Sequence, residues 1–290
     1  MGWHLVSFRE ITMTEDAGLC ENYPLIKRKF LSEFGLMLPK DLQASSKRKL
    51  LELSKNGPKK KANLSNVTSD GEPLDQYLLA LIEIFTVNHT SFFRIKKQFE
   101  FLKSIALPTL VKQLAKNNKK FKLRFWSAAA ASGEEAYSII LTVSDFMKDF
   151  NLDLNTSVLA TDINISSLET ASTGTYKNHK IAGKLDPHHF ENLIENADGS
   201  HQFSDEIRQK VETRFLNLNS KNYNLNNKFH VIFCRNILFY LSNDSRVRLT
   251  KNLLQQLEVG GYLFLGTSET QLIHSASLVQ VGPAIYRKRQ

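Results

Sequence analysis

The residues with the clearest chemical meaning lie at 125–138, where the chain reads Phe-Trp-Ser-Ala-Ala-Ala-Ala-Ser-Gly-Glu-Glu-Ala-Tyr-Ser. An apolar strand is expected to run into a turn of small residues and then into a helix that begins with Glu134 and Glu135. In α/β folds, this arrangement presents backbone N–H groups and a helix N-terminus to a cofactor. Because a dinucleotide fingerprint needs three glycines and this turn has one, a pyrophosphate cradle is not expected.

The charge of this segment narrows the choice of cofactor. Glu134 and Glu135 would repel a phosphate group and attract a cation. The segment therefore favours a nucleotide-like cofactor that carries an ammonium or sulfonium charge, such as S-adenosylmethionine.

A further acid, Asp162, ends the short apolar strand predicted at 157–163, 27 residues after Glu135. In nucleotide-binding α/β folds, an acid at this place hydrogen-bonds the ribose hydroxyls. The alternative role is the N-cap of the next helix, which Asn164 or Ser166 could equally provide. We favour ribose binding.

A third motif, Asn-His-Thr-Ser-Phe-Phe-Arg at 88–94, precedes the first strand. Arg94 can pair with a carboxylate of a cofactor or substrate through two parallel hydrogen bonds. Phe92 and Phe93 are expected to pack and to fix the segment. The residue types alone leave the role of this motif open.

The elements that must position these residues alternate between strand and helix. Strands are predicted at 123–127, 157–163, 229–236 and 259–266, and helices at 134–150, 166–174 and 245–257. This alternation predicts an α/β fold with a doubly wound, mostly parallel sheet and a ligand at the carboxyl ends of its strands. The alternation breaks between Tyr176 and Asn217, a stretch too long for a plain connection. We interpret about 176–217 as an inserted subdomain.

The N-terminal part of the chain is predicted to be helical and is strongly basic. Apolar residues recur at helical spacing within 25–38, 46–53 and 74–85, and 59–73 is predicted to be an exposed linker. The segment from Lys27 to Lys61 contains eleven basic residues and three acidic residues, so it carries +8 of the net charge of +9. Such a concentration of positive charge indicates an acidic partner, which could be a nucleic acid, an anionic lipid or an acidic protein. The alternative interpretation is a solvated helical surface without a partner. We divide the chain into a basic helical domain with its linker (1–73) and a cofactor domain (74–290).

Composition excludes several classes of protein. A chain of 290 residues with 42% hydrophobic and 23% charged residues is ordinary for a globular protein. Cys20 and Cys234 match no metal or redox spacing, so we predict no metal site and a reducing compartment. The first ten residues do not resemble a signal peptide, and no apolar run could span a bilayer. We expect a cytoplasmic protein without membrane insertion, and nothing demands more than a monomer.

Together these motifs resemble the CheR family, the chemotaxis receptor protein-glutamate O-methyltransferases. The family pattern Asn-x-Thr-x-Phe-Phe-Arg matches at 88–94, and its Gly-Glu-Glu-x-Tyr-Ser signature matches at 133–138. Its further motifs match at Asp162-Ile163, Gly174-x-Tyr176, Phe233-Cys234-Arg235-Asn236 with Tyr240, and Gly266-x-Ser268-Glu269. The resemblance covers most of the chain, and it implies a Rossmann-like methyltransferase domain with a small inserted β subdomain.

The resemblance also implies an activity and a set of site residues. The enzyme would transfer a methyl group from S-adenosylmethionine to receptor glutamates for sensory adaptation, leaving S-adenosylhomocysteine. The implied cofactor contacts are Asn88, Thr90 and Arg94 at the reactive end, Glu135 at the amino group, Asp162 at the ribose, Asn217 and Leu218 at the adenine, and Arg235 and Asn236 closing the pocket. Arg94 and Tyr240 are the implied catalytic residues, with the Tyr240 hydroxyl near the methyl group or the incoming glutamate. Judged by residue type alone, Asn217 is also a turn candidate and Tyr240 a core candidate.

Two departures from the family pattern stand out. Ala136 replaces a proline that members usually carry, and Ala128 and Ala129 stand where many members have glycine. Proline at a helix start is preorganising rather than chemical. Alanine in the turn matters only if the backbone there must adopt a positive φ.

Two rival functions remain open. One is a methyltransferase that acts on RNA, a small molecule or another acidic substrate, and the other is a cofactor-sensing scaffold without turnover. Apart from Phe30 and Phe34, the basic segment lacks the aromatic residues that stack on bases, so no nucleic-acid partner is expected. The scaffold hypothesis is disfavoured because Arg94, Glu135, Asp162 and Tyr240 are all present, whereas a protein that had lost its activity would be expected to have lost some of them. We therefore expect chemotaxis receptors to bind the basic N-terminal domain.

Overall fold

Three helices form the first block of the computed structural model, which describes residues 16–58, 76–86, 88–115 and 122–289, without the side chains of 16–21. The helices are α1 (Asp16–Phe34), α2 (Ala44–Asn56) and α3 (Gln76–Phe85). Each helix buries an apolar stripe against the other two, and Phe30, Leu50 and Leu81 are completely inaccessible to solvent. The three predicted helices are confirmed within the described residues. The predicted linker at 59–73 lies outside them.

A seven-stranded sheet with the order β6-β2-β1-β7-β8-β10-β9 forms the centre of the second block. Its strands are β1 (Lys122–Ala128), β2 (Asn155–Asp162), β6 (Val211–Phe215), β7 (Phe229–Cys234), β8 (Leu257–Leu265), β9 (Leu278–Gly282) and β10 (Ile285–Lys288). Neighbouring strands from β6 to β8 run parallel, and β10 runs antiparallel to both β8 and β9. The predicted α/β class and mostly parallel sheet are confirmed.

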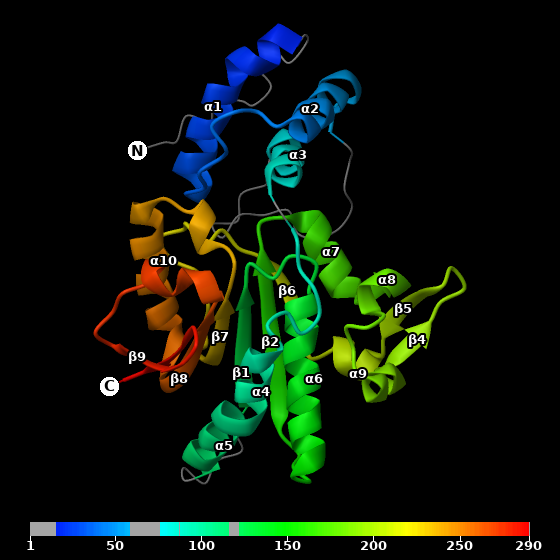
Figure 1. The fold of residues 1–290 in the computed structure, drawn as a ribbon, viewed down its shortest axis with the longest axis vertical. Helices are drawn as coiled ribbons and strands as arrows, with labels where there is room; N and C mark the ends of the chain where they lie inside the picture. Colours follow the sequence, from blue (N-terminus) through cyan, green and yellow to red (C-terminus); the bar gives the residue numbers. More distant parts are fainter. Residues whose placement is uncertain (1–15, 59–75, 87, 116–121, 290) are drawn as a thin grey trace.

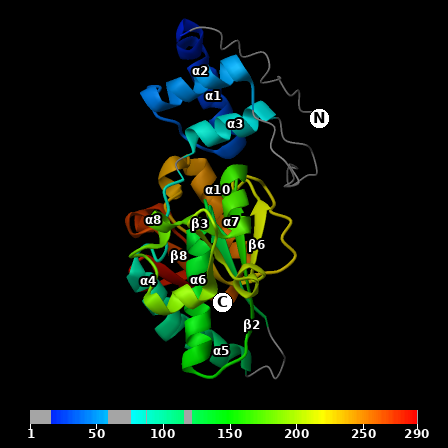
Figure 2. The same cartoon turned by 90° about the vertical axis from the view of Figure 1, so that its right-hand side faces the viewer.

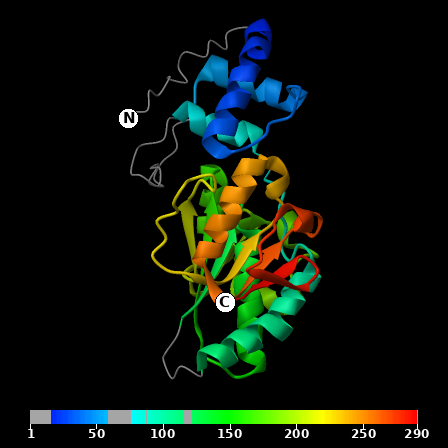
Figure 3. The same ribbon diagram turned by 90° about the vertical axis from the view of Figure 1, so that its left-hand side faces the viewer.

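Both faces of this sheet are covered by helices. Phe125 and Phe233 pack on the side of α4 (Lys96–Phe101), the π-turn η2 (Leu102–Ala106), α5 (Leu107–Ala115) and α6 (Glu134–Asp149). Trp126 and Ile232 pack on the opposite side, with α10 (Asn243–Gln256). Figures 2 and 3 show α6 and α10 in front of the sheet from opposite sides, which is the doubly wound arrangement.

A second, three-stranded sheet with the order β3-β5-β4 is built from the segment that follows α7 (Ile165–Thr173). Its elements are β3 (Thr175–Lys177), α8 (Asn178–Ile181), η3 (Pro187–Asn192), β4 (Leu193–Glu195), β5 (Ser200–Phe203) and α9 (Asp205–Arg208). The inserted unit therefore contains the predicted β-structure, but its predicted end at 217 is wrong. Strand β6 pairs with β2 in the large sheet. Its exposed Glu212 and Arg214 made this edge strand too polar to recognise.

The helical block lies over the carboxyl ends of the parallel strands (Figure 1). Residues 35–37 run beside 240–242, where Leu36 and Leu241 form an antiparallel bridge. The Met37 N–H donates to the Tyr240 carbonyl over 2.7 Å, and the Ser242 N–H donates to the Gly35 carbonyl over 2.9 Å. These contacts fix the block above the end of the sheet where a ligand is expected. Within the described residues, no helix is both long and apolar enough to cross a bilayer.

Candidate active site

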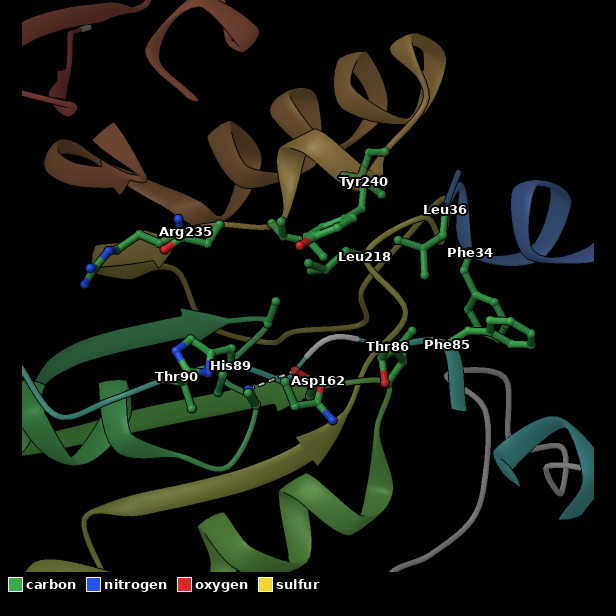
Figure 4. A pocket seen from close by; sticks show the side chains of 18 of the residues that line it. Phe34, Leu36, Phe85, Thr86, His89, Thr90, Asp162, Leu218, Arg235 and Tyr240 are labelled. Atoms are coloured by element: carbon green, nitrogen blue, oxygen red, sulfur yellow. Dashed lines mark hydrogen bonds between the residues drawn. The ribbon is translucent and has the colours of Figure 1, made fainter. Parts of the chain in front are cut away.

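A cavity of about 680 Å³ lies between the helical block and the carboxyl ends of β1, β2 and β7 (Figure 4). This volume lies within the range of about 300–1,000 Å³ that is typical of small-molecule sites. All ten site residues expected from the sequence line the cavity: Asn88, Thr90, Arg94, Glu135, Asp162, Asn217, Leu218, Arg235, Asn236 and Tyr240. The fold thus brings together residues from five separate stretches of the chain.

The turn between β1 and α6 forms one wall of the cavity and has left-handed backbone at two alanines. The φ angle is 62° at Ala129 and 48° at Ala131. A non-glycine residue in this conformation costs about 1–2 kcal/mol. The replacement of glycine by alanine in this turn, noted in the sequence, therefore has an energetic consequence.

We predict that Ala129→Gly raises the free energy of unfolding by about 0.5–1 kcal/mol. Relief of the left-handed strain outweighs the greater chain entropy of glycine in the unfolded state. Urea denaturation would measure the change. Ala130→Gly is the matched control because Ala130 is buried without a positive φ, so this variant should lose stability. A loss of stability in both variants would refute the assignment of strain to Ala129.

The Asp162 carboxylate lies at the end of β2 and is held by two backbone amides. Its Oδ2 accepts from the Ala131 N–H over 2.8 Å, and its Oδ1 accepts from the Asn164 N–H over 2.9 Å. The N-cap of α7 is Asn164, whose Oδ1 accepts from the Ser167 N–H over 3.0 Å. Asp162 is therefore not the helix cap, and its remaining lone pairs can accept from a ligand. Burial raises the pKa of Asp162, and the backbone hydrogen bonds oppose this shift.

The Glu135 carboxylate is held between a hydroxyl and a guanidinium. The Ser127 Oγ donates to Glu135 Oε1 over 2.6 Å, and Arg235 Nη1 lies 3.2 Å from Glu135 Oε2. Burial raises the pKa of Glu135, while the charge of Arg235 lowers it. Burial likewise lowers the pKa of Arg235. Ser127 does not line the cavity but orients Glu135 from beneath it, and the sequence did not reveal this role because serine in a strand carries no distinctive signal.

Glu134, the neighbouring acid, does not line the cavity, so the expectation that both acids attract a cationic ligand is wrong for this one. Its side chain is completely buried, accepts from Ser132 Oγ over 2.6 Å and lies 3.4 Å from Lys180 Nζ. Consecutive helix residues point in different directions. Of these two adjacent acids, therefore, only Glu135 can contact a ligand in the cavity.

The loop at 88–94 is tied to both the sheet and the inserted unit. Arg235 Nη2 donates to the Arg94 carbonyl, and Arg94 Nη1 donates to the His89 carbonyl over 2.9 Å. Phe92 packs edge-on against Tyr176, and Phe93 stacks on His189. The expected packing role of the two phenylalanines is confirmed. These contacts place Arg94 at the cavity wall.

The loop from Arg235 to Tyr240 is held by Glu269, which the sequence analysis noted only as part of a motif. The carboxylate is completely buried and accepts from the N–H groups of Asn236 (2.7 Å), Leu238 (2.8 Å) and Gly266 (2.8 Å). Asn236 has a φ of 61°. Glu269 thus fixes a left-handed residue that lines the cavity.

The helical block contacts the segments that follow β6 and β2, and both segments form part of the cavity wall. Asn217 Nδ2 donates to the Glu33 carbonyl over 2.7 Å, and Asn164 Nδ2 donates to Thr86 Oγ1 over 2.9 Å. Asn217 Oδ1 also accepts from the Asn219 N–H over 2.9 Å, so Asn217 is both a turn residue and a cavity residue. The sequence analysis had assigned residues 1–73 to partner binding and had placed the α3 segment in the cofactor domain.

Tyr240 is not a core residue, since 41% of it is exposed. Figure 4 shows its hydroxyl directed into the cavity, across from His89 and Thr90. Its backbone carbonyl accepts from the Met37 N–H. The helical block therefore also positions Tyr240.

A doubly wound sheet with Asp162 at the end of β2 and Glu135 at the start of α6, beneath a cavity of nucleotide size, fits a methyltransferase that uses S-adenosylmethionine. Residues 88–282 match the family "CheR methyltransferase, SAM binding domain". The chain belongs to this family, and S-adenosylmethionine is its cofactor.

Relatives in three bacteria support the assignment over most of the chain. A chemotaxis protein methyltransferase of Borreliella burgdorferi is 33% identical, covering 73% of this chain and 74% of that protein. Chemotaxis protein methyltransferase 1 of Vibrio cholerae is 35% identical, covering 72% of this chain and 75% of that protein. Chemotaxis protein methyltransferase 1 of Pseudomonas aeruginosa is 34% identical, covering 72% and 77%. The resemblance seen in the sequence is confirmed.

Proposed function

We propose that this protein transfers the methyl group of S-adenosylmethionine to glutamate side chains of chemotaxis receptors and so forms glutamyl methyl esters. The observation that carries the proposal is the convergence of all ten family-implied residues on one cavity. The names of the related proteins support the receptor as substrate.

The cavity fits the cofactor in volume and in the polar groups that line it. Asp162 would hold the ribose, since its carboxylate is already oriented and keeps lone pairs for hydroxyl donors. Glu135 would hold the amino group, and Asn217 with Leu218 would flank the adenine. Asn88, Thr90 and Arg94 would line the reactive end, with Arg235 and Asn236 behind it. The bound cofactor supplies an activated methyl group on a sulfonium centre.

The task of the protein in this reaction is orientation rather than proton transfer. A glutamate side chain with a pKa of about 4.3 is already ionised at neutral pH, so it needs no general base. Arg94 would orient the incoming carboxylate by paired hydrogen bonds, and the Tyr240 hydroxyl would contact the reacting groups. Covering the cavity with the helical block excludes water and strengthens these interactions.

The basic face of the helical block is the proposed receptor-binding surface. Helix α2 begins at the cavity, which Gln43, Ser45 and Ser46 line, and it continues through the basic residues at 47–49. A glutamate-rich receptor helix bound there would have side chains within reach of the cavity. The basic residues at 59–61 lie outside the described part of the structure.

We predict that reversing the charge of Lys47, Arg48 and Lys49 together weakens receptor binding at low salt by at least tenfold, or about 1.4 kcal/mol. The salt dependence of binding should fall as well, because exposed charges act through screened attraction. S-adenosylhomocysteine affinity should be unchanged. Binding to receptor-containing membranes across a salt series would measure both effects.

The matched control reverses Lys112, Lys122 and Lys251, which are exposed at other places and change the net charge equally. This control should bind receptor almost as wild type does. Equal losses in both triple variants would show that net charge, rather than the α2 surface, governs binding.

The activity itself is tested with radiolabelled S-adenosylmethionine and receptor membranes. Base-labile label on the receptor, lost when its acceptor glutamates are replaced by alanine, is the expected result. Label on RNA would favour the rival methyltransferase class. Cofactor binding without transfer to any of these substrates would favour a scaffold.

A further inference from the structure

The inserted unit is fastened to α6 by a cluster of two histidines and one carboxylate outside the cavity. Asp145 lies on α6, and His188 and His189 lie on η3. Asp145 Oδ1 is 3.1 Å from His188 Nε2, and Asp145 Oδ2 is 3.1 Å from His189 Nε2. Two consecutive side chains thus direct the same ring atom toward one carboxylate, and one ligand atom from each of the three residues lies within 4.8 Å of the other two.

We propose that Asp145, His188 and His189 form a binding site for one zinc ion. Imidazole nitrogen and carboxylate oxygen are ordinary zinc ligands, with bond lengths of about 2.0–2.2 Å. In a tetrahedral site these lengths place ligand atoms about 3.3–3.5 Å apart. Each ring Nε2 lies 3.1 Å from a different oxygen of Asp145, a separation close to this value, so one ion would be held by both rings and the carboxylate after the side chains adjust. Water would complete the coordination.

The surroundings provide both rigidity and access. The His189 side chain is 3% exposed, and its ring stacks on Phe93 with centroids 5.3 Å apart and an interplanar angle of 9°. The His188 side chain is 53% exposed, so an ion can enter from solvent. The nearby Lys148 is paired with Glu191. Because Glu191 neutralises the positive charge of Lys148, this lysine would repel a bound zinc ion only weakly.

Zinc at this place would join three parts of the molecule. It would bridge α6 and the inserted unit, and the stacked Phe93 precedes Arg94 in the cavity loop. We therefore infer a structural site that stabilises the docking of the inserted unit. These three residues form no recognisable metal-binding motif in the sequence, because the aspartate lies 43 residues from the nearer histidine.

The test is zinc titration of tag-free, metal-stripped protein by calorimetry, with cobalt absorption to report the ligands. Wild type should bind one zinc ion through this cluster and should melt at a higher temperature with zinc, because a ligand that binds the folded state stabilises it. His188→Ala should weaken binding at least about tenfold and abolish the melting shift. Because His188 is exposed, this variant should fold, which circular dichroism would verify.

His179→Ala is the matched control, since His179 is an exposed histidine of the same inserted unit that lies outside the cluster. It should bind zinc as wild type does. The proposal is overturned if wild type takes up no zinc, or if His188→Ala and wild type bind it equally. In either case the cluster would only connect the inserted unit to α6 by hydrogen bonds, without a bound ion.

Discussion

Gly35→Ala should lower the free energy of unfolding by about 2–5 kcal/mol and weaken S-adenosylhomocysteine binding at least tenfold. A Cβ at Gly35 would lie 2.1 Å from Ser245 Oγ and 2.9 Å from Asn219 Oδ1, and the φ there is +67°. Left-handed strain costs about 1–2 kcal/mol, and overpacking adds about 1–3 kcal/mol. Relief of the clash would move the end of α1 away from Asn217 and Tyr240, and both residues line the cavity. Chemical denaturation and calorimetry would measure the two effects.

Gly57→Ala is the control variant, because it introduces backbone strain at a positive φ without the steric clash expected for Gly35→Ala. Gly57 has a φ of +66°, and an added Cβ would find its nearest neighbour, Tyr77 Oη, at 4.0 Å. Because the ψ of 176° at Gly57 lies in a region that is essentially restricted to glycine, this variant should lose about 1–3 kcal/mol of stability from backbone strain alone and keep its cofactor affinity. If Gly35→Ala bound S-adenosylhomocysteine as tightly as Gly57→Ala does, the helical block would have no part in shaping the cofactor site.

Glu269→Gln is expected to destabilise the protein by about 3 kcal/mol and to reduce methyl transfer. The carboxylate accepts three backbone N–H groups. A glutamine offers one oxygen and an NH₂ group, which would face an N–H donor and leave it unsatisfied at about 1–3 kcal/mol for each group. Because Oε2 accepts from both Asn236 and Gly266, the glutamine oxygen would take that position, and the Leu238 N–H in the cavity loop would lose its acceptor. Thermal unfolding and single-turnover kinetics would report both losses.

Glu258→Gln provides the comparison for this substitution. Glu258 lies on the same strand that leads to Glu269, but it is partly exposed and its carboxylate is 3.9 Å from Arg124 Nη2. Exposed ion pairs contribute at most about 1 kcal/mol. Similar losses in the two variants would contradict the role given to the buried carboxylate.

Local patterns predicted the four central strands of the sheet and the position of Asp162, whereas most of the cavity residues were implied by the family resemblance. Apolar runs marked β1, β2, β7 and β8, and parallel strands bring their carboxyl-end residues together. This reasoning placed Asp162 correctly, and the structure then separated it from the helix cap at Asn164. The charge pattern alone could not show which of two adjacent acids lines the cavity, because that depends on the rotation of α6 against the sheet; only the family resemblance pointed to Glu135.

The contacts of the helical block escaped prediction for a different reason. Gly35, Leu36 and Met37 contact the segment at 240–242 across roughly two hundred residues of sequence, and no local period encodes such a pairing. The same holds for Glu269, which bonds only to backbone groups. The position of the cavity at the carboxyl ends of the strands could therefore be predicted from local sequence patterns, whereas its closure by the helical block depends on tertiary contacts that no local pattern encodes.

Calorimetric binding of S-adenosylhomocysteine to wild type and to Asp162→Ala tests the central claim most directly. The cavity should bind one molecule in the wild type, and loss of the charged acceptor should weaken binding by about 1.5–3 kcal/mol or more. Circular dichroism would establish that both proteins are folded. Equal affinity in the two folded proteins, or no binding by wild type, would contradict the assignment of this cavity as the cofactor site.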